Sequence, residues 1–157
     1  MRLFKGLLAF SILAAGSAAF GAKCETTVTA MPGMKFDTKE IVIPTACTNT
    51  FSIKLVNTET IPKAAMGHNL VVVKTDKMAA LTSAAIPAGL AGNYLPKDKS
   101  IYVAATKVLG PKETETITLD ATKLKAIAAA PHSFVCTFPG HFAIMKGQIK
   151  YKMAKKS

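Results

Sequence analysis

The chain has 157 residues, of which 50% are hydrophobic, and it carries a formal net charge of +11. This length is that of one domain once a targeting segment is removed, and the apolar content is enough for a sizeable core. The lysines are scattered and not interleaved with aromatic residues, which argues against a nucleic-acid partner and fits attraction to acidic proteins or an anionic membrane face.

The N-terminus has the pattern of a secretory signal peptide. Arg2 and Lys5 supply its positive start, and an uncharged, mostly apolar run follows as far as Ala22. The alternative is an uncleaved membrane anchor, but the run is at the short limit for a bilayer span. We therefore expect residues 1–21 to be a removed signal peptide and residues 22–157 to be the mature domain, without a membrane span.

Short alternating segments bounded by turn residues dominate the rest of the chain. The alternation is clearest in residues 51–55, where Phe51, Ile53 and Leu55 fall on one face. The continuous apolar run from Leu70 to Val73 is typical of a strand buried on both faces. The other predicted strands are 41–44, 101–106, 114–119, 133–136 and 148–152.

One segment has helical spacing, and Asp76 is its predicted N-terminal cap. Pro87 and Gly89 are expected to stop or bend this helix, and a second short turn is predicted at residues 121–125. About seven or eight short strands with one inserted short helix predict an all-β fold, a Greek-key two-sheet β-sandwich.

The chain has three cysteines, so in an exported protein one thiol is left outside a disulfide. Any two of the three could pair. A Cys24–Cys47 bridge would close a loop of roughly twenty residues and contribute about 3 kcal/mol by the chain-entropy argument. Cys136 would then be free, and a metal that binds it as a thiolate would protect it in an oxidising compartment.

The segment Cys136-Thr-Phe-Pro-Gly-His141-Phe-Ala-Ile-Met145 places a thiolate, an imidazole and a thioether within ten residues. Its Pro-Gly turn lets a short loop direct these three side chains at one centre, and its apolar residues keep water away. His68, in the upstream sequence Gly67-His68-Asn69, can supply a second imidazole once the chain folds. Two His, one Cys and a weak axial Met form the ligand set of a blue-copper electron-transfer site.

Two other chemistries fit the loop less well. Zinc prefers four strong ligands and seldom a thioether, and the loop has no carboxylate. A Cys–His nucleophile pair would need an oxyanion hole and an orienting residue, for which Asn69 is the candidate, but an apolar Met-containing loop gives no reason for acyl transfer. His132 has no partner at ligand spacing, and we expect it at the surface or beside the site, not as a ligand.

Further short motifs match one known family. They are Pro62-Lys63, Met66-Gly67-His68-Asn69, Tyr94-Leu95, Thr106-Lys107, Leu119-Asp120, Lys123-Leu124, Cys136-Thr-Phe-Pro-Gly-His141 and Met145-Lys146-Gly147. With them the chain resembles the azurins, blue type 1 copper proteins of the cupredoxin family, from Cys24 to about Lys152. The spacing of four residues from Cys to His and three from His to Met resembles azurin more than plastocyanin or pseudoazurin.

The resemblance implies a role for each residue of the site. His68, Cys136 and His141 would be the trigonal ligands of one copper ion, and Met145 would be the long axial ligand. The backbone carbonyl of Gly67 would be a weak ligand on the opposite side.

The resemblance also implies supporting residues. Cys24–Cys47 would be the disulfide, and Asn69 would tie the two ligand loops together. Phe138 would pack beside the thiolate, with its backbone N–H bonded to sulfur. An apolar patch around a near-surface His141 would dock redox partners; its residues would be Met34, Ile61, Ala65, Met66, Phe138, Pro139, Gly140 and Phe142.

The chain departs from the azurin pattern in several ways: it is more basic than many azurins, Phe142 is larger than the usual residue beside the exposed histidine, and two further positions differ. The buried tryptophan of the family is replaced by Leu70, which changes core packing but not function. A histidine that titrates with redox state in some azurins is replaced by Asn57, so a change in potential linked to pH at that position should be missing.

From these residues and the resemblance we expect a monomeric periplasmic protein that carries single electrons between redox proteins and is not an enzyme. Its partners would be c-type cytochromes or copper or haem oxidoreductases. A copper-delivery protein is the first alternative, but delivery favours an exposed, exchangeable site. A small cupredoxin enzyme is the second, and it would need a second copper or an open coordination position.

Overall fold

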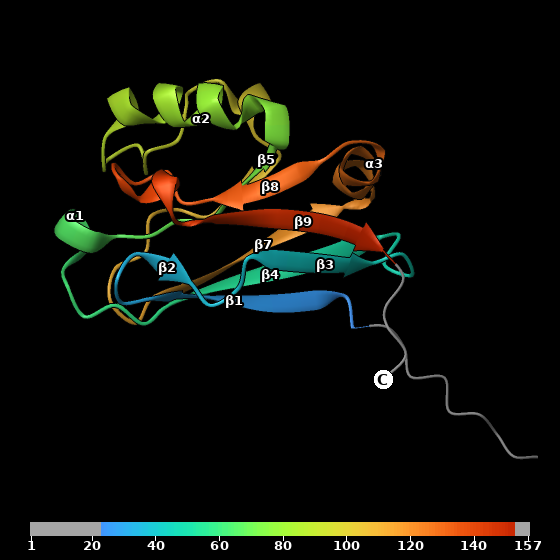
Figure 1. Ribbon diagram of the computed structural model, residues 1–157, viewed down its shortest axis with the longest axis horizontal. Coiled ribbons are helices and arrows are strands. Elements are labelled where there is room, and N and C mark those ends of the chain that lie inside the picture. Colours follow the sequence, from blue (N-terminus) through green and yellow to red (C-terminus); the bar gives the residue numbers. More distant parts are fainter. Residues whose placement is uncertain (1–22, 153–157) are drawn as a thin grey trace, which may run out of the picture.

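The computed structural model describes residues 23–152 as two β-sheets packed into a sandwich (Figure 1). The signal peptide predicted over residues 1–21 lies outside this range. The four-stranded sheet has the order β2 (Lys35–Phe36), β1 (Glu25–Met31), β4 (Thr50–Asn57), β7 (Thr114–Asp120). The five-stranded sheet has the order β3 (Glu40–Pro44), β9 (Lys146–Lys152), β8 (His132–Val135), β5 (Val71–Lys74), β6 (Ala104–Ala105). The predicted two-sheet sandwich is confirmed, and two pairs, β1–β4 and β3–β9, are parallel.

Alternation along the strands builds the core between the sheets. Phe51, Ile53 and Leu55 of β4 are buried, and the first two lie opposite Leu119 and Ile117 of β7. Because side chains alternate across a strand, the intervening residues face outward. The expected inward face of residues 51–55 is therefore confirmed.

Strand β5 is covered on both faces, as its continuous apolar run predicts. Val72 belongs to the main core, whereas Val71 and Val73 pack with Leu81 in a second apolar cluster. Leu81 lies on helix α2 (Met78–Ala85), which covers this outer face of the sheet (Figure 1).

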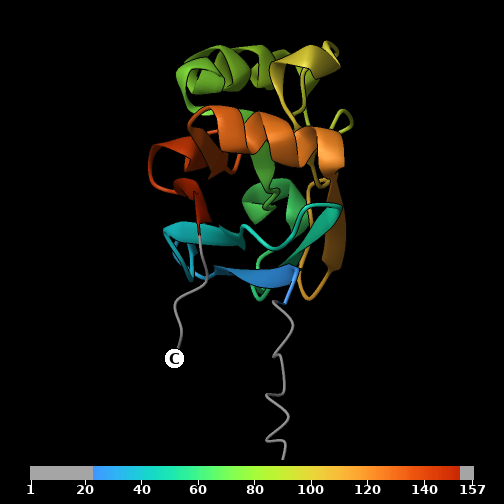
Figure 2. The same ribbon diagram turned by 90° about the vertical axis from the view of Figure 1, so that its right-hand side faces the viewer.

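The helices differ in detail from the prediction. Helix α2 lies where it was expected, but Asp76 does not cap it; this residue lies in the preceding 3₁₀ turn η1 (Thr75–Lys77). The turn predicted at residues 121–125 is a full helix, α3 (Ala121–Ala129). Asp120 caps the N-terminus of this helix, because its side chain accepts a hydrogen bond from the N–H of Lys123. In Figure 2, α3 lies across the end of the sandwich opposite the short helix α1 (Lys63–Met66).

Three further 3₁₀ turns complete the described chain: η2 (Ile86–Ala88), η3 (Lys99–Ile101) and η4 (His141–Ala143). The strand predicted at residues 101–106 is shorter in the structure, where only the two residues of β6 are in a strand, although the N–H groups of Val103 and Thr106 also donate to the carbonyls of Val72 and Leu70. Among the described residues, no helix is long and apolar enough to cross a membrane.

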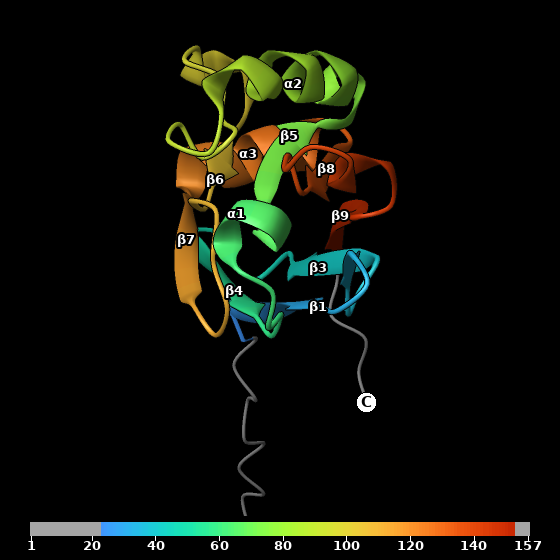
Figure 3. The same ribbon diagram turned by 90° about the vertical axis from the view of Figure 1, so that its left-hand side faces the viewer.

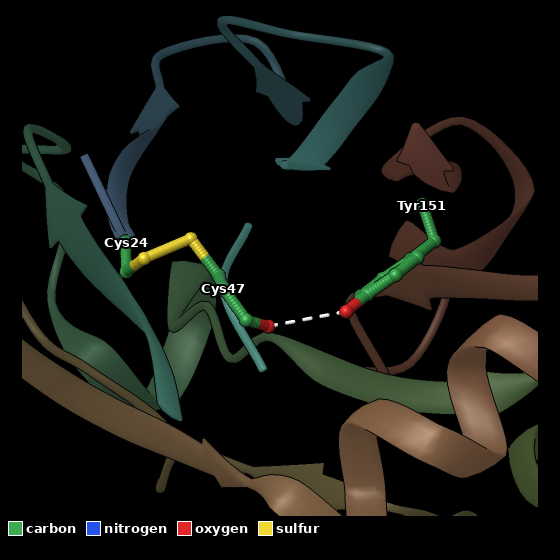
Figure 4. The surroundings of a disulfide bond; sticks show 3 residues. All are labelled: Cys24, Cys47 and Tyr151. Atoms are coloured by element: carbon green, nitrogen blue, oxygen red, sulfur yellow. Dashed lines mark hydrogen bonds between the residues drawn. A yellow bond between two sulfur atoms is a disulfide. The ribbon is translucent and has the colours of Figure 1, made fainter. Parts of the chain in front are cut away.

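The predicted disulfide between Cys24 and Cys47 is confirmed, and it joins the start of β1 to the segment between β3 and β4. Tyr151 of β9 donates its hydroxyl to the carbonyl of Cys47 at 3.1 Å, which links the bridge to the other sheet (Figure 4). Cys136 is the free cysteine and is buried.

Candidate metal centre

Three side chains from distant parts of the chain converge at one end of the sandwich. His68 follows α1, Cys136 follows β8, and His141 begins η4. Their donor atoms all lie within 4.8 Å of one another, and all three residues are buried. We call these three residues the donor cluster.

The spacing of the donor atoms fits a single bound ion. The Nδ1 atoms of His68 and His141 are 3.2 Å apart, and Sγ of Cys136 lies 3.7 Å from Nδ1 of His141. Bonds of about 2.0 Å to nitrogen and 2.3 Å to sulfur would then subtend roughly 105° and 120° at the ion. Both angles are close to trigonal, so His141 can share one ion with His68 and with Cys136, and all three donor atoms lie within 4.8 Å of one another.

The loop that carries two of the donors is closed by its own backbone. The N–H of Cys136 donates to the carbonyl of Met145 at 2.9 Å, and the N–H of Met145 donates to that of His141 at 2.8 Å. Gly140 has φ of 82°, a left-handed conformation that glycine adopts without strain. Met145 is fully buried, and its backbone is bonded to both Cys136 and His141.

Backbone hydrogen bonds and close packing hold His68, the third donor, in place. His68 forms a two-way backbone bridge with Leu109, at 3.1 and 2.7 Å. A Cβ on Gly67 would lie 2.4 Å from Cγ1 of Val108 and 2.6 Å from the carbonyl oxygen of Lys63. Only glycine therefore fits at this position.

Burial keeps the donor cluster electrically neutral in the metal-free protein. It lowers the pKa of His68 to about 4, an effect that the neighbouring His141 strengthens and Glu59 opposes. Burial also lowers the pKa of His141. It raises the pKa of the Cys136 thiol to about 11, although hydrogen bonds from the backbone N–H groups of Asn69 and Phe138 oppose this rise.

The ring of His68 has one polar atom without a partner. Its Nε2 atom is the one buried side-chain nitrogen or oxygen in the described part of the chain that lacks a hydrogen bond. With Nδ1 turned toward the other donors, Nε2 is the atom left to carry the ring proton.

Asn69 joins the two segments that carry the donors, as the resemblance implies. It donates from Nδ2 to Oγ1 of Thr137 at 2.8 Å, and its Oδ1 accepts from the N–H of Thr137 at 2.8 Å. Asn69 also donates to the carbonyl of Asn93 at 3.0 Å, and the hydroxyl of Thr137 donates to that of Tyr94 at 2.7 Å.

The sequence reasoning missed Thr137 and Asn93 as supporting residues. Asn93 adopts φ of 56°, and its Oδ1 accepts the N–H of Val108. Asparagine tolerates this left-handed conformation better than most residues. The residue type was therefore the one hint in the sequence that Asn93 lies in a tight turn. Thr137 lies inside the loop from Cys136 to Met145, but it was not singled out because it is not one of the sulfur or imidazole donors.

Phe138 lies against the donor cluster, as expected. Its ring centroid is 4.6 Å from that of His141 and 5.1 Å from that of Tyr94. Phe138 therefore covers part of the His141 ring, and Tyr94 meets Phe138 edge-on.

The residues of the expected docking patch lie on segments that meet at the same end of the molecule. Figure 3 looks onto this end, where α1, the β1–β2 turn and the loop through η4 come together. Ile61 is 42% exposed, and Ala65, Pro139 and Gly140 are exposed, whereas Met34 and Met66 are half-buried. His141 is buried below this surface, and Phe142 packs partly against the apolar cluster under α2.

His132 is not at the surface. It lies buried in β8, outside the donor cluster, and its Nδ1 is 2.8 Å from the carbonyl oxygen of Ala130. Its place in a central strand explains the burial, which the sequence spacing did not reveal.

Comparison with known proteins assigns the family. The profile described as "Copper binding proteins, plastocyanin/azurin family" matches residues 22–152. The chain belongs to the plastocyanin/azurin family of copper-binding proteins. An azurin of Pseudomonas fluorescens biotype B is 40% identical over 131 residues, which is 83% of this chain and 100% of the relative. An azurin of Bordetella pertussis is 38% identical over 150 residues, which is 94% of this chain and 98% of the relative.

A solved structure agrees. The azurin Az-iso2 of the methylotroph Methylomonas sp. strain J superposes with a TM-score of 0.76 at 28% identity, covering 83% of this chain and 98% of that one. The resemblance drawn from the sequence motifs is thereby confirmed, as is the cupredoxin fold. Copper is the metal of this plastocyanin/azurin protein, which is a blue-copper protein of the electron-transfer type.

Proposed function

We propose that the chain is a periplasmic one-electron carrier that holds one type 1 copper ion in the donor cluster. The observation that carries this proposal is the buried convergence of two imidazole nitrogens and one thiol, at separations that suit one metal ion. In this assignment His68, Cys136 and His141 are the strong ligands. Met145 is the axial ligand, and the carbonyl of Gly67 lies on the opposite side.

Copper, when bound, supplies a one-electron couple between its cuprous and cupric states, and the mixed sulfur and nitrogen donors suit both. The chain's own residues hold those donors still. Asn69 and Thr137 lock the two donor segments to each other, and the backbone bonds of Met145 close the loop. A site that moves little when its charge changes favours fast electron exchange.

The partners we propose are redox proteins of the periplasm, such as c-type cytochromes or copper or haem oxidoreductases. They would dock on the apolar residues over His141, since an apolar face sheds water easily and forms weak complexes that separate quickly. Residues 1–21 would be the export signal, and the mature protein would act as a monomer with no substrate of its own.

The test is the absorption and EPR spectrum of the copper-loaded protein, followed by electron exchange with a purified c-type cytochrome. We expect one copper per chain and an intense blue thiolate-to-copper band, which Cys136→Ser should abolish because only sulfur gives that transition. The matched control is Ser133→Ala on β8, which leaves the donors intact and should keep the band. A colourless stoichiometric copper complex, or a band that survives Cys136→Ser, would refute the proposed site.

A further inference from the structure

Glu59 is a buried carboxylate on the loop between β4 and α1, at the end of the molecule that carries the donor cluster. It is only 3% exposed, and acidic residues are seldom buried unless they are paired. Its Oε1 accepts the backbone N–H groups of Thr60 at 2.9 Å and Ile61 at 3.4 Å. None of the ion pairs within residues 23–152 includes it. Backbone amides therefore hold this carboxylate while no cation neutralises it.

A short series of hydrogen bonds connects Glu59 to the segment of His68. The N–H of Glu59 donates to Oδ1 of Asn57 at 2.9 Å. The Nδ2 of Asn57 donates to the carbonyl of Leu109 at 3.0 Å, and Leu109 forms the backbone bridge to His68. All four residues are buried, so their relative positions are fixed.

Glu59 and His68 are thus tied to one another through buried groups at the same end of the molecule. The ring of His68 has its Nε2 buried without a partner. A charge in a poorly solvated interior is weakly screened, so it acts on any cation that the donor cluster accepts.

We propose that Glu59 sets the preference of the donor cluster between metal ions of different charge. A fixed negative charge stabilises a divalent ion more than a monovalent one, because the Coulomb energy scales with the charge of the ion. For copper, Glu59 therefore favours the cupric state and lowers the reduction potential. This inference rests on the proposed function, in which His68, Cys136 and His141 bind the metal.

The test is Glu59→Gln, which keeps the shape and an acceptor oxygen for Thr60 and Ile61 but removes the charge. Competition titrations of the metal-free protein with Zn²⁺ and with Ag⁺ measure the preference without any electron transfer. We expect the ratio of Zn²⁺ affinity to Ag⁺ affinity to fall about tenfold. The reduction potential of the copper-loaded variant should rise by about 59 mV, which is a tenfold change for a one-electron couple.

Glu113→Gln is the control, because Glu113 also accepts a backbone N–H in a nearby turn, but its side chain is 46% exposed and pairs with Lys63 at 3.0 Å. Water screens its charge, so this variant should leave the affinity ratio unchanged. Equal weakening of Zn²⁺ and Ag⁺ in Glu59→Gln would mean a structural role alone and would overturn the proposal, as would an unchanged ratio.

A second pair of variants separates charge from loop packing. Glu59→Asp and Glu59→Ala both weaken the bonds to Thr60 and Ile61, but only the first keeps the charge. The aspartate variant should keep the ratio near that of the unaltered chain, and the alanine variant should lose it; equal ratios would overturn the proposal. Failure of the unaltered chain to form a blue copper complex would instead overturn the proposed function.

Discussion

Met145 is the expected axial ligand, whose bond to the metal is the weakest of the set. It is fully buried, and its backbone bonds join it to both Cys136 and His141. Leucine has a similar volume, so Met145→Leu should keep the fold and the blue band. The reduction potential should rise, because a donor that stabilises cupric copper is lost. Voltammetry beside the absorption spectrum measures both, and an unchanged potential would show that the thioether is not a ligand.

Gly67, next to the donor His68, lies where the backbone packs too tightly for a side chain. The Cβ of Gly67→Ala would meet Cγ1 of Val108 at 2.4 Å and a backbone carbonyl oxygen of Lys63 at 2.6 Å. The carbonyl cannot move away without distorting α1, so we expect the free energy of unfolding to fall by about 1–3 kcal/mol. Urea unfolding of the metal-free protein measures this loss. Ala65→Ser, on the exposed side of α1, is the control and should change stability by no more than about 0.5 kcal/mol.

At the scale of elements, the site depends on a junction between the segment before β5 and the segment after β8. Asn69 spans it with paired hydrogen bonds to Thr137. Asn69→Leu leaves the buried N–H of Thr137 unpaired, at a cost of about 1–3 kcal/mol. We expect lower stability and a shifted reduction potential, since the donor segments are no longer tied.

Thr137→Ser is the control for this junction because it keeps the hydroxyl and the backbone N–H. Thermal unfolding and voltammetry of both variants give the comparison. If Asn69→Leu and Thr137→Ser behaved alike, the paired bonds would not be what holds the two segments in place.

Strands were predictable where burial sets the pattern. The alternation in β4 and the continuous apolar run in β5 follow from one buried face and from two. The prediction was wrong at the start of residues 101–106, because Asp98 accepts the N–H of Ser100 and Ile101 ends the 3₁₀ turn η3 in place of beginning a strand. The sequence shows the apolar residues there, but not which of two local hydrogen-bond patterns wins.

The site was predictable where its residues share one loop. Cys136, His141 and Met145 are close in the sequence, and their donor types alone indicate a metal site. Glu59 and Asn93 gave no such signal, because their importance comes from hydrogen bonds across loops that only the folded chain brings together. Polar residues that act through backbone groups leave no spacing to detect.

At the scale of the whole molecule, the donor cluster links the stability of the metal-free fold to pH. The pKa of His68 falls from 6.5 to about 4, so between these values the unfolded chain binds a proton that the folded chain does not. Stability is therefore lost as the pH drops from about 6.5 toward 4. The pKa of Cys136 rises from 9.0 to about 11, so the unfolded chain loses its proton first and stability is lost as the pH rises through that range.

The metal-free protein should accordingly be most stable between about pH 6.5 and 9. Urea unfolding over a pH series measures this, and Cys136→Ser should flatten the alkaline side of the profile. An alkaline side of equal slope in that variant would assign the loss to groups other than this thiol.

The same pKa values fix how many protons copper displaces. At pH 7 both imidazoles of the donor cluster are neutral and the thiol of Cys136 is protonated, whereas a metal requires the thiolate. Binding should release about one proton per copper at pH 7 and a number approaching zero above about pH 11. Calorimetric titration of copper into the metal-free protein, in two buffers of different ionisation enthalpy, counts these protons. Zinc should release the same number, since the proton comes from the protein and not from redox chemistry, and a release of none at pH 7 would mean that the thiol is already ionised before the metal arrives.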